Sequence, residues 1–133
     1  VGAGSGILTV GAVKLGAAKV IGIEIDDVAL KAGRANLRTN GVSGVARFYA
    51  GTLPSTHVPD ACADLVLANV NSVALVKLAP GLAAAVKPHG HIVAAGILTE
   101  RQQSVEDAFA AANLRIDERV NDDDWVVLVC QLG

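Results

Sequence analysis

Apolar and polar positions follow two different spacings along this chain, and the spacings predict strands and helices in alternation. Nearly unbroken apolar runs are expected in strands of a parallel sheet, because both faces of such a sheet are covered. Apolar residues at helical spacing predict amphipathic helices. We predict strands at 20–25, 45–50, 63–69 and 91–96, and helices after the glycine-rich start and at 28–40, 73–86 and 101–113.

Glycine and proline mark where these elements end. Gly41 is expected to close the helix at 28–40, since glycine adopts the left-handed conformation found after helix ends. Residues 51–60 predict a loop and residues 87–90 a turn. Pro80 lies inside a helical pattern, so it should begin a new helical segment or bend the existing helix.

The carboxyl-terminal part predicts a hairpin. Two strands, at 114–120 and 125–132, flank the acidic turn 121–124. Alternating strands and helices followed by a hairpin predict an α/β fold with a Rossmann-like doubly wound sheet. That sheet should be mostly parallel, with an antiparallel edge strand.

Length, composition and charge exclude several classes of protein. With 133 residues, the chain is expected to form one domain, 1–133. Hydrophobic residues make up 52%, so disorder is not expected. A net charge of -2 argues against direct nucleic-acid binding and leaves a basic protein or a small molecule as the easier partner. No apolar run is long enough for a membrane span, and no metal site is expected. Cys62 and Cys130 fit buried thiols in a reducing cytosol, with a disulfide as the alternative.

The first residues carry the strongest functional signal. Gly2, Gly4 and Gly6 permit a tight turn and a close approach to a ligand. The helix that follows would direct its unpaired N–H groups toward an anionic group. A dinucleotide fingerprint would have its third glycine where Ile7 stands, so the spacing favours S-adenosylmethionine over a nicotinamide cofactor. A structural turn without a ligand is the alternative interpretation.

Glu24 is the second candidate. It lies at the carboxyl end of the predicted strand at 20–25, and ligands of open α/β sheets bind beyond the carboxyl ends of the strands. A carboxylate there can accept hydrogen bonds from both hydroxyls of a ribose. The alternative is a solvated charge at a strand end. Asp26 competes for the ribose role, but it is better placed to cap the next helix.

Several segments together resemble a class I S-adenosylmethionine methyltransferase, and more specifically the PrmA family, which methylates large-subunit ribosomal protein eleven. The segments that carry this resemblance are Gly2-Ala3-Gly4-Ser5-Gly6-Ile7-Leu8, Gly22-Ile23-Glu24-Ile25-Asp26, Asn40-Gly41-Val42, Leu67-Ala68-Asn69-Val70, Leu78-Ala79-Pro80, Lys87-Pro88-His89-Gly90, Gly96-Ile97-Leu98 and Trp125-Val126-Val127-Leu128. The order of the segments also matches, and the match extends over nearly the whole chain.

The resemblance implies a role for each matching residue. The loop with Gly2, Gly4 and Gly6 would hold the methionine end of S-adenosylmethionine, and Glu24 its ribose. Thr52, in Gly51-Thr52-Leu53, would contact the cofactor where many relatives have an acidic residue. Asn69 would face the methyl-transfer site as both a catalytic and a cofactor-binding residue, with a structural hydrogen bond to the following loop as its alternative role.

The residues after Asn69 bear on the acceptor. Methyltransferases of adenine or glutamine amides often have two prolines and an aromatic residue there, whereas this chain has Val70-Asn71-Ser72. An amine of a protein is therefore the more natural acceptor. No general base emerges, because His57, His89 and His91 fit surface or structural roles better.

The predicted function is that of a cytoplasmic S-adenosylmethionine-dependent protein methyltransferase acting on a ribosomal protein. A noncatalytic cofactor-binding fragment of this fold is the alternative, and a nicotinamide-dependent oxidoreductase is a weaker one. Val1 would be the last residue of the first strand of such a fold. We therefore expect a truncated first strand and a recognition domain outside these 133 residues.

Overall fold

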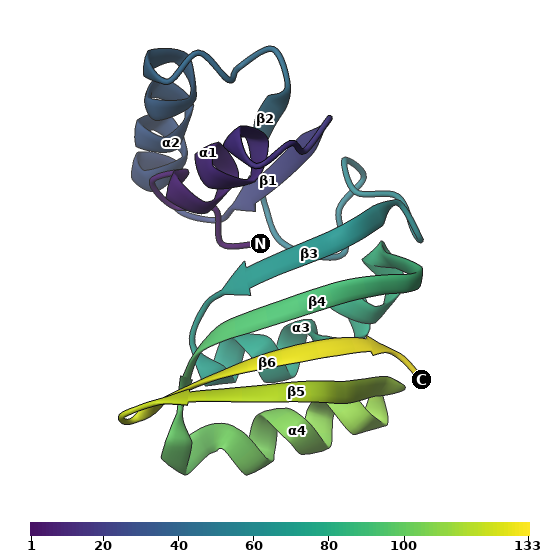
Figure 1. Cartoon of the computed structure of the whole chain (residues 1–133). Coiled ribbons are helices and arrows are strands. Elements are labelled where there is room, and N and C mark those ends of the chain that lie inside the picture. Colours follow the sequence, from purple (N-terminus) through teal and green to yellow (C-terminus); the bar gives the residue numbers. More distant parts are fainter. The chain divides into compact units, whose positions relative to one another are not determined.

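Strands and helices alternate along the chain (Figure 1), and the computed structural model describes residues 1–133. The chain divides into two units, Val1–His57 and Val58–Gly133, each with its own sheet. The elements of the first unit are α1 (Ile7–Lys14), β1 (Val20–Glu24), α2 (Asp27–Thr39) and β2 (Ala46–Ala50). Those of the second are β3 (Ala63–Asn69), α3 (Ser72–Ala85), β4 (Val86–Leu98), a 3-10 turn η1 (Thr99–Arg101), α4 (Gln102–Ala111), β5 (Leu114–Asp122) and β6 (Trp125–Leu132).

The first unit is built on a parallel pair of strands, β1 and β2. Side chains alternate between the two faces of a strand, so β2 directs Ala46 and Phe48 to one face and Arg47 and Tyr49 to the other. The first pair is buried in a core with three residues of α2 and the segment after it, namely Leu30, Leu37 and Val42. One face of this sheet is therefore covered by helix, whereas the other bears polar side chains.

Both ends of α2 form as the sequence predicts. The Asp26 side chain caps the helix, because its Oδ1 accepts hydrogen bonds from the backbone N–H groups of Val28 (2.8 Å) and Ala29 (3.1 Å). At the other end Gly41 has a φ of 69° and donates its N–H to the carbonyl of Arg38. The assignment of Asp26 to capping is confirmed.

The second unit has a sheet with the strand order β3-β4-β6-β5. β3 and β4 are parallel, and β6 runs antiparallel to both of its neighbours, β4 and β5. The predicted hairpin is thus confirmed, and the reversed strand β6 lies beside the edge strand β5. The α/β class is confirmed as well.

Helices α3 and α4 cover the sheet of the second unit (Figure 1). The largest fully buried side chains belong to both layers, and in the second unit they are Phe109, Leu75, Leu82, Ile92, Ile97, Leu128, Val86, Val105, Val126 and Cys130. None of the helices combines the length and the apolar character that a bilayer crossing requires.

One local prediction needs correction, and one pair of alternatives is resolved. Residues 87–90 do not separate a helix from a strand as a turn, because β4 already begins at Val86. The irregularity falls inside the strand, where Ala63 pairs with Val86 but Leu65 pairs with His91, so the strand bulges and His89 adopts a φ of 66°. Pro80 lies within the single helix α3, so of the two predicted alternatives it does not begin a new helical segment.

Candidate functional site

The glycine-rich start of the chain forms a loop against the carboxyl end of β1. Gly2, Gly4 and Gly6 have φ values of 68°, 54° and 86°, a region in which a side chain is strained. The N–H groups of Gly2 and Ala3 both donate to the carbonyl of Ile23, at 3.0 and 3.1 Å. All three glycines are therefore required by the backbone conformation itself.

Glu24 joins this loop to the start of α2. Its Oε1 accepts a hydrogen bond from the Gly4 N–H at 2.8 Å, and its Oε2 accepts one from the Asp26 N–H at 3.1 Å. The glycine loop and Glu24, which the sequence predicts to bind the cofactor, are thus in direct contact. Each carboxylate oxygen has a further lone pair, so the same group can accept hydrogen bonds from ligand hydroxyls while it holds the loop.

The loop also packs closely on α2, through residues that the sequence analysis did not single out. A Cβ at Gly33 would lie 2.5 Å from the Gly4 carbonyl oxygen and 2.6 Å from the Phe48 ring. Asn36 donates its side-chain N–H to the Ser5 carbonyl at 2.8 Å. The signal that could have identified Gly33 is its place inside a predicted helix, where glycine is unfavourable unless something approaches closely.

Thr52 lies beyond the carboxyl end of β2. The preceding residue, Gly51, donates its N–H to the Glu24 carbonyl at 2.9 Å, so this segment begins beside the end of β1. The Thr52 side chain is exposed. The first unit therefore gathers the glycine loop, Glu24 and the Gly51-Thr52 segment at one edge of its sheet, whereas Asn69 belongs to the second unit.

Asn69 is the last residue of β3, and its side chain is exposed and makes no hydrogen bond within the protein. The structural role belongs instead to Asn71, whose Oδ1 accepts a hydrogen bond from the Ala74 N–H at 2.9 Å and caps α3. The structure therefore leaves the Asn69 amide able to donate to and accept from a ligand.

Gly96 lies close to Asn69 and to the residue that follows it. It has a φ of 84°, and a Cβ there would lie 2.4 Å from the Val70 carbonyl oxygen and 3.2 Å from Asn69 Oδ1. The pairing of β4 with β6 shifts between Ala94 and Ile97, so Gly96 lies in a bulge. Bulges of this kind redirect a strand next to a site.

The histidines and cysteines are placed outside this edge of the first sheet. His57 stacks on Tyr49 with ring centroids 3.8 Å apart, and the His91 Nε2 lies 2.6 Å from Gln131 Nε2 in a side-chain hydrogen bond. Both cysteines are free, although Cys62 is only half-buried rather than buried as predicted. Burial raises the pKa of the Cys130 thiol to about 12, which keeps it protonated and unreactive.

The residues present fit a sulfonium cofactor with a ribose. The carboxylate of Glu24 is fixed by two backbone N–H groups. A Cβ built on Gly4 meets only the Gly2 carbonyl oxygen, at 3.8 Å, so the space beside the loop is open to a ligand. A positioned acceptor next to an open glycine loop is what a ribose and the chain attached to it require.

Comparison with known sequences gives one family. The family model described as ribosomal protein L11 methyltransferase (PrmA) matches residues 1–132. Relatives named ribosomal protein L11 methyltransferase are 41% identical over 124 residues in Shewanella pealeana and 39% identical over 133 residues in Geobacter metallireducens. These alignments cover 93% and 100% of this chain, but only 41% and 43% of the relatives, so the chain spans less than half their length.

Solved structures agree with the sequence comparison. The ribosomal protein L11 methylase from Lactobacillus delbrueckii subsp. bulgaricus matches with a TM-score of 0.91 and 29% identity, over 99% of this chain and 67% of that one. An RNA methyltransferase from Salinibacter ruber in complex with S-adenosyl-L-homocysteine matches with a TM-score of 0.75 and 23% identity, over 99% of this chain and 77% of that one. The second likeness shows the fold alone.

Proposed function

The chain belongs to the ribosomal protein L11 methyltransferase (PrmA) family, and from that premise we propose that it binds S-adenosylmethionine and serves methyl transfer to amines of ribosomal protein L11. The observation that carries the proposal is the contact between Glu24 and the glycine loop, because the Gly4 N–H donates to Glu24 at 2.8 Å. This contact puts the Glu24 carboxylate, which would accept hydrogen bonds from the ribose, beside an open, glycine-lined surface.

The cofactor roles are assigned to the first unit. Gly2, Gly4 and Gly6 would surround the methionine end, Glu24 would accept hydrogen bonds from the ribose hydroxyls, and Thr52 would border the adenine. The bound cofactor supplies an electrophilic methyl group on a sulfonium. The chain contributes orientation of that group and exclusion of water around it.

Asn69 is proposed to act on the acceptor side. An amine must be neutral before it can attack a methyl group in line, and an amide oxygen can accept a hydrogen bond from the amine and hold its lone pair toward the methyl group. The exposed Asn69 side chain has no other hydrogen-bond partner. The proton lost by the amine passes to solvent in this proposal, since no histidine is assigned as a base.

The partner is proposed to be ribosomal protein L11, in agreement with the names of the Shewanella and Geobacter relatives. Such a substrate places the enzyme in the cytoplasm. The acceptor is a protein rather than a nucleic acid, and a net charge of -2 offers little attraction for a polyphosphate.

Calorimetric titration with S-adenosylmethionine and, separately, with NAD tests the cofactor. We expect heat from S-adenosylmethionine only, and binding of NAD alone would contradict the proposal. Transfer of a radiolabelled methyl group to purified ribosomal protein L11 tests the reaction. Asn69→Ala should lower the transfer rate by a larger factor than it weakens cofactor binding, because Asn69 is assigned to the acceptor as well as to the cofactor. Cofactor binding without any transfer would favour the alternative of a noncatalytic binding module.

A further inference from the structure

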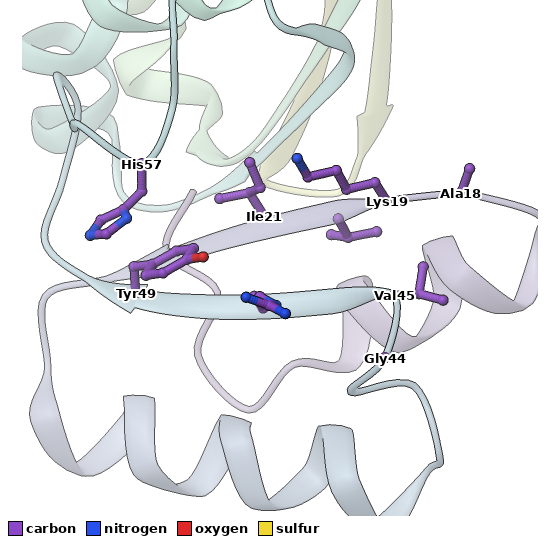
Figure 2. Close-up of a pocket in the computed structure, with 9 residues that line it drawn as sticks. Ala18, Lys19, Ile21, Gly44, Val45, Tyr49 and His57 are labelled. Carbon is purple, nitrogen blue, oxygen red and sulfur yellow. The ribbon is translucent and has the colours of Figure 1, made fainter.

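A concave surface lies on the face of β1 and β2 that the helices leave open (Figure 2). It encloses about 440 Å³, a volume within the range of small-molecule pockets. All of its lining residues belong to the first unit, and they are Ala18, Lys19, Val20, Ile21, Gly44, Val45, Arg47, Tyr49 and His57. It shares no residue with the glycine loop, Glu24 or Thr52.

Strand register brings two cations together on this face. Ile21 pairs directly with Arg47 in the parallel ladder, and Lys19 lies two residues before Ile21 on the same side of the chain. Lys19 and Arg47 are therefore diagonal neighbours, roughly 7–8 Å apart at their backbones, a span that long side chains can close. Both side chains are exposed, and neither forms a hydrogen bond or an ion pair.

No acidic residue lines the surface to neutralise these cations. Glu24, on the same strand, alternates to the opposite face, and its carboxylate is held by the N–H groups of Gly4 and Asp26. Two adjacent unpaired cations in a concave surface are a site for an anion, and an arginine favours the paired oxygens of phosphate or carboxylate.

The other end of the surface is aromatic. The rings of Tyr49 and His57 are stacked with an interplanar angle of 7°, and Figure 2 shows the Tyr49 hydroxyl pointing along the sheet, away from the loop that carries His57. Tyr49 follows Arg47 by two residues, so the two side chains emerge on the same face. Stacked rings beside cations provide a platform for a planar ring attached to an anion.

From this arrangement we propose that the open face of β1 and β2 binds a phosphorylated nucleoside, with the phosphate at Lys19 and Arg47 and the base against Tyr49 and His57. The ligand chemistry is that of a mononucleotide unit, supplied either by a free nucleotide or by the end of an RNA strand. Ile21 and Val45, which lie on the same face as Arg47, would contact its apolar edges. This site is separate from the proposed cofactor site and does not depend on it.

Titration of the 133-residue chain with uridine monophosphate, in the presence of saturating S-adenosylhomocysteine, tests the site, because the added cofactor product blocks nucleotide binding at the glycine loop. Arg47→Gln should weaken binding about tenfold, the scale of one charge-assisted hydrogen bond. Tyr49→Leu should weaken it about fivefold or more, whereas Tyr49→Phe should keep it. Lys31→Gln, which removes a cation from an exposed position of α2, is the matched control and should change nothing.

Comparison of the affinities of several ligands identifies the chemical class of ligand that the site binds. Inorganic phosphate and uridine should each bind at least tenfold more weakly than uridine monophosphate, and equal binding of phosphate would overturn the assignment. A short RNA with a 5′ phosphate that binds more tightly than the mononucleotide identifies RNA as the source, and equal affinities identify the free nucleotide. Absence of binding, or tighter binding of an acidic peptide, would refute the proposal.

Discussion

The Glu24 carboxylate accepts a hydrogen bond from the Gly4 N–H across 20 residues of sequence, with an oxygen-to-nitrogen distance of 2.8 Å. One oxygen thus holds the loop while the other accepts from the Asp26 N–H at 3.1 Å. A residue that ends a strand therefore also sets the shape of the loop before that strand. Loss of its charge should affect the ligand and the loop together.

Glu24→Ala should weaken S-adenosylmethionine binding by roughly 1.5–3 kcal/mol, the scale of charge-assisted hydrogen bonds, while the fold persists. Calorimetric titration measures the change, and circular dichroism checks the fold. Asp27→Asn, an exposed neighbouring carboxylate with no hydrogen bond, is the control. Unchanged affinity in Glu24→Ala would assign the ribose to another residue.

Gly4→Val should abolish cofactor binding with a modest effect on folding. Gly4 has a φ of 54°, which a β-branched side chain disfavours strongly, and the new side chain would project into the open space beside the loop. Gly11→Ala is the matched control, because a Cβ at Gly11 meets nothing within 4 Å and alanine favours the helix. If Gly4→Val binds S-adenosylmethionine normally, the loop is a structural turn without a role in cofactor binding.

Gly96→Ala should lower the free energy of unfolding by about 2 kcal/mol or more, because it combines a positive φ with a contact to the Val70 carbonyl oxygen. Denaturation in urea measures this loss. Gly44→Ala, where a Cβ meets nothing within 4 Å, should be almost neutral. Since Gly96 also approaches Asn69, methyl transfer should fall further than stability alone explains, and a variant as stable as the original would contradict this account.

The two thiols should react differently. At pH 8 iodoacetamide should label Cys62, which is half-buried, and spare Cys130, which is fully buried and whose pKa burial raises to about 12. Mass spectrometry after a timed reaction counts the labels. In Cys62→Ser, labelling should require unfolding in urea. Rapid labelling of Cys130 in the native protein would show that the hydrophobic core of the second unit is exposed by frequent local unfolding.

Acid should weaken the contact between α4 and β5. Arg119 donates two hydrogen bonds to Glu106, at 2.8 and 2.9 Å, and they lower the pKa of that carboxyl. A lowered pKa in the folded state contributes stability above the unfolded pKa, near 4.5, and this contribution is lost as pH falls through the lower folded value. Melting temperatures between pH 6 and pH 3 should therefore fall more steeply in the original chain than in Glu106→Gln. If the melting temperatures of the two proteins fall in parallel, the ion pair of Arg119 and Glu106 does not contribute to acid sensitivity.

Periodicity was sufficient to predict most of the fold, because buried strands and amphipathic helices leave strong local patterns. β3 forms at 63–69 as predicted, and Asp26 caps α2. The bulge at His89 was missed, since it depends on packing against other elements rather than on local sequence. The sequence also left open whether Pro80 begins a new helical segment, and the structure has a single helix there. In the candidate site, the glycines and Glu24 could be singled out by residue type and spacing. The need for glycine at position 33 could not, because it depends on the close approach of the Gly4 carbonyl oxygen in the folded chain.

The ring of Phe48 occupies space that two glycines leave vacant, since a Cβ at Gly22 would lie 2.4 Å from the ring and one at Gly33 would lie 2.6 Å from it. The three positions therefore cannot vary independently during evolution. Gly33→Ala should be tolerated better once Phe48 has been shortened to leucine, although the Gly4 carbonyl oxygen would still limit the gain. Substitutions around the glycine loop are thus expected to occur in pairs. Replacement of Phe48 by a smaller residue should come before replacement of either glycine.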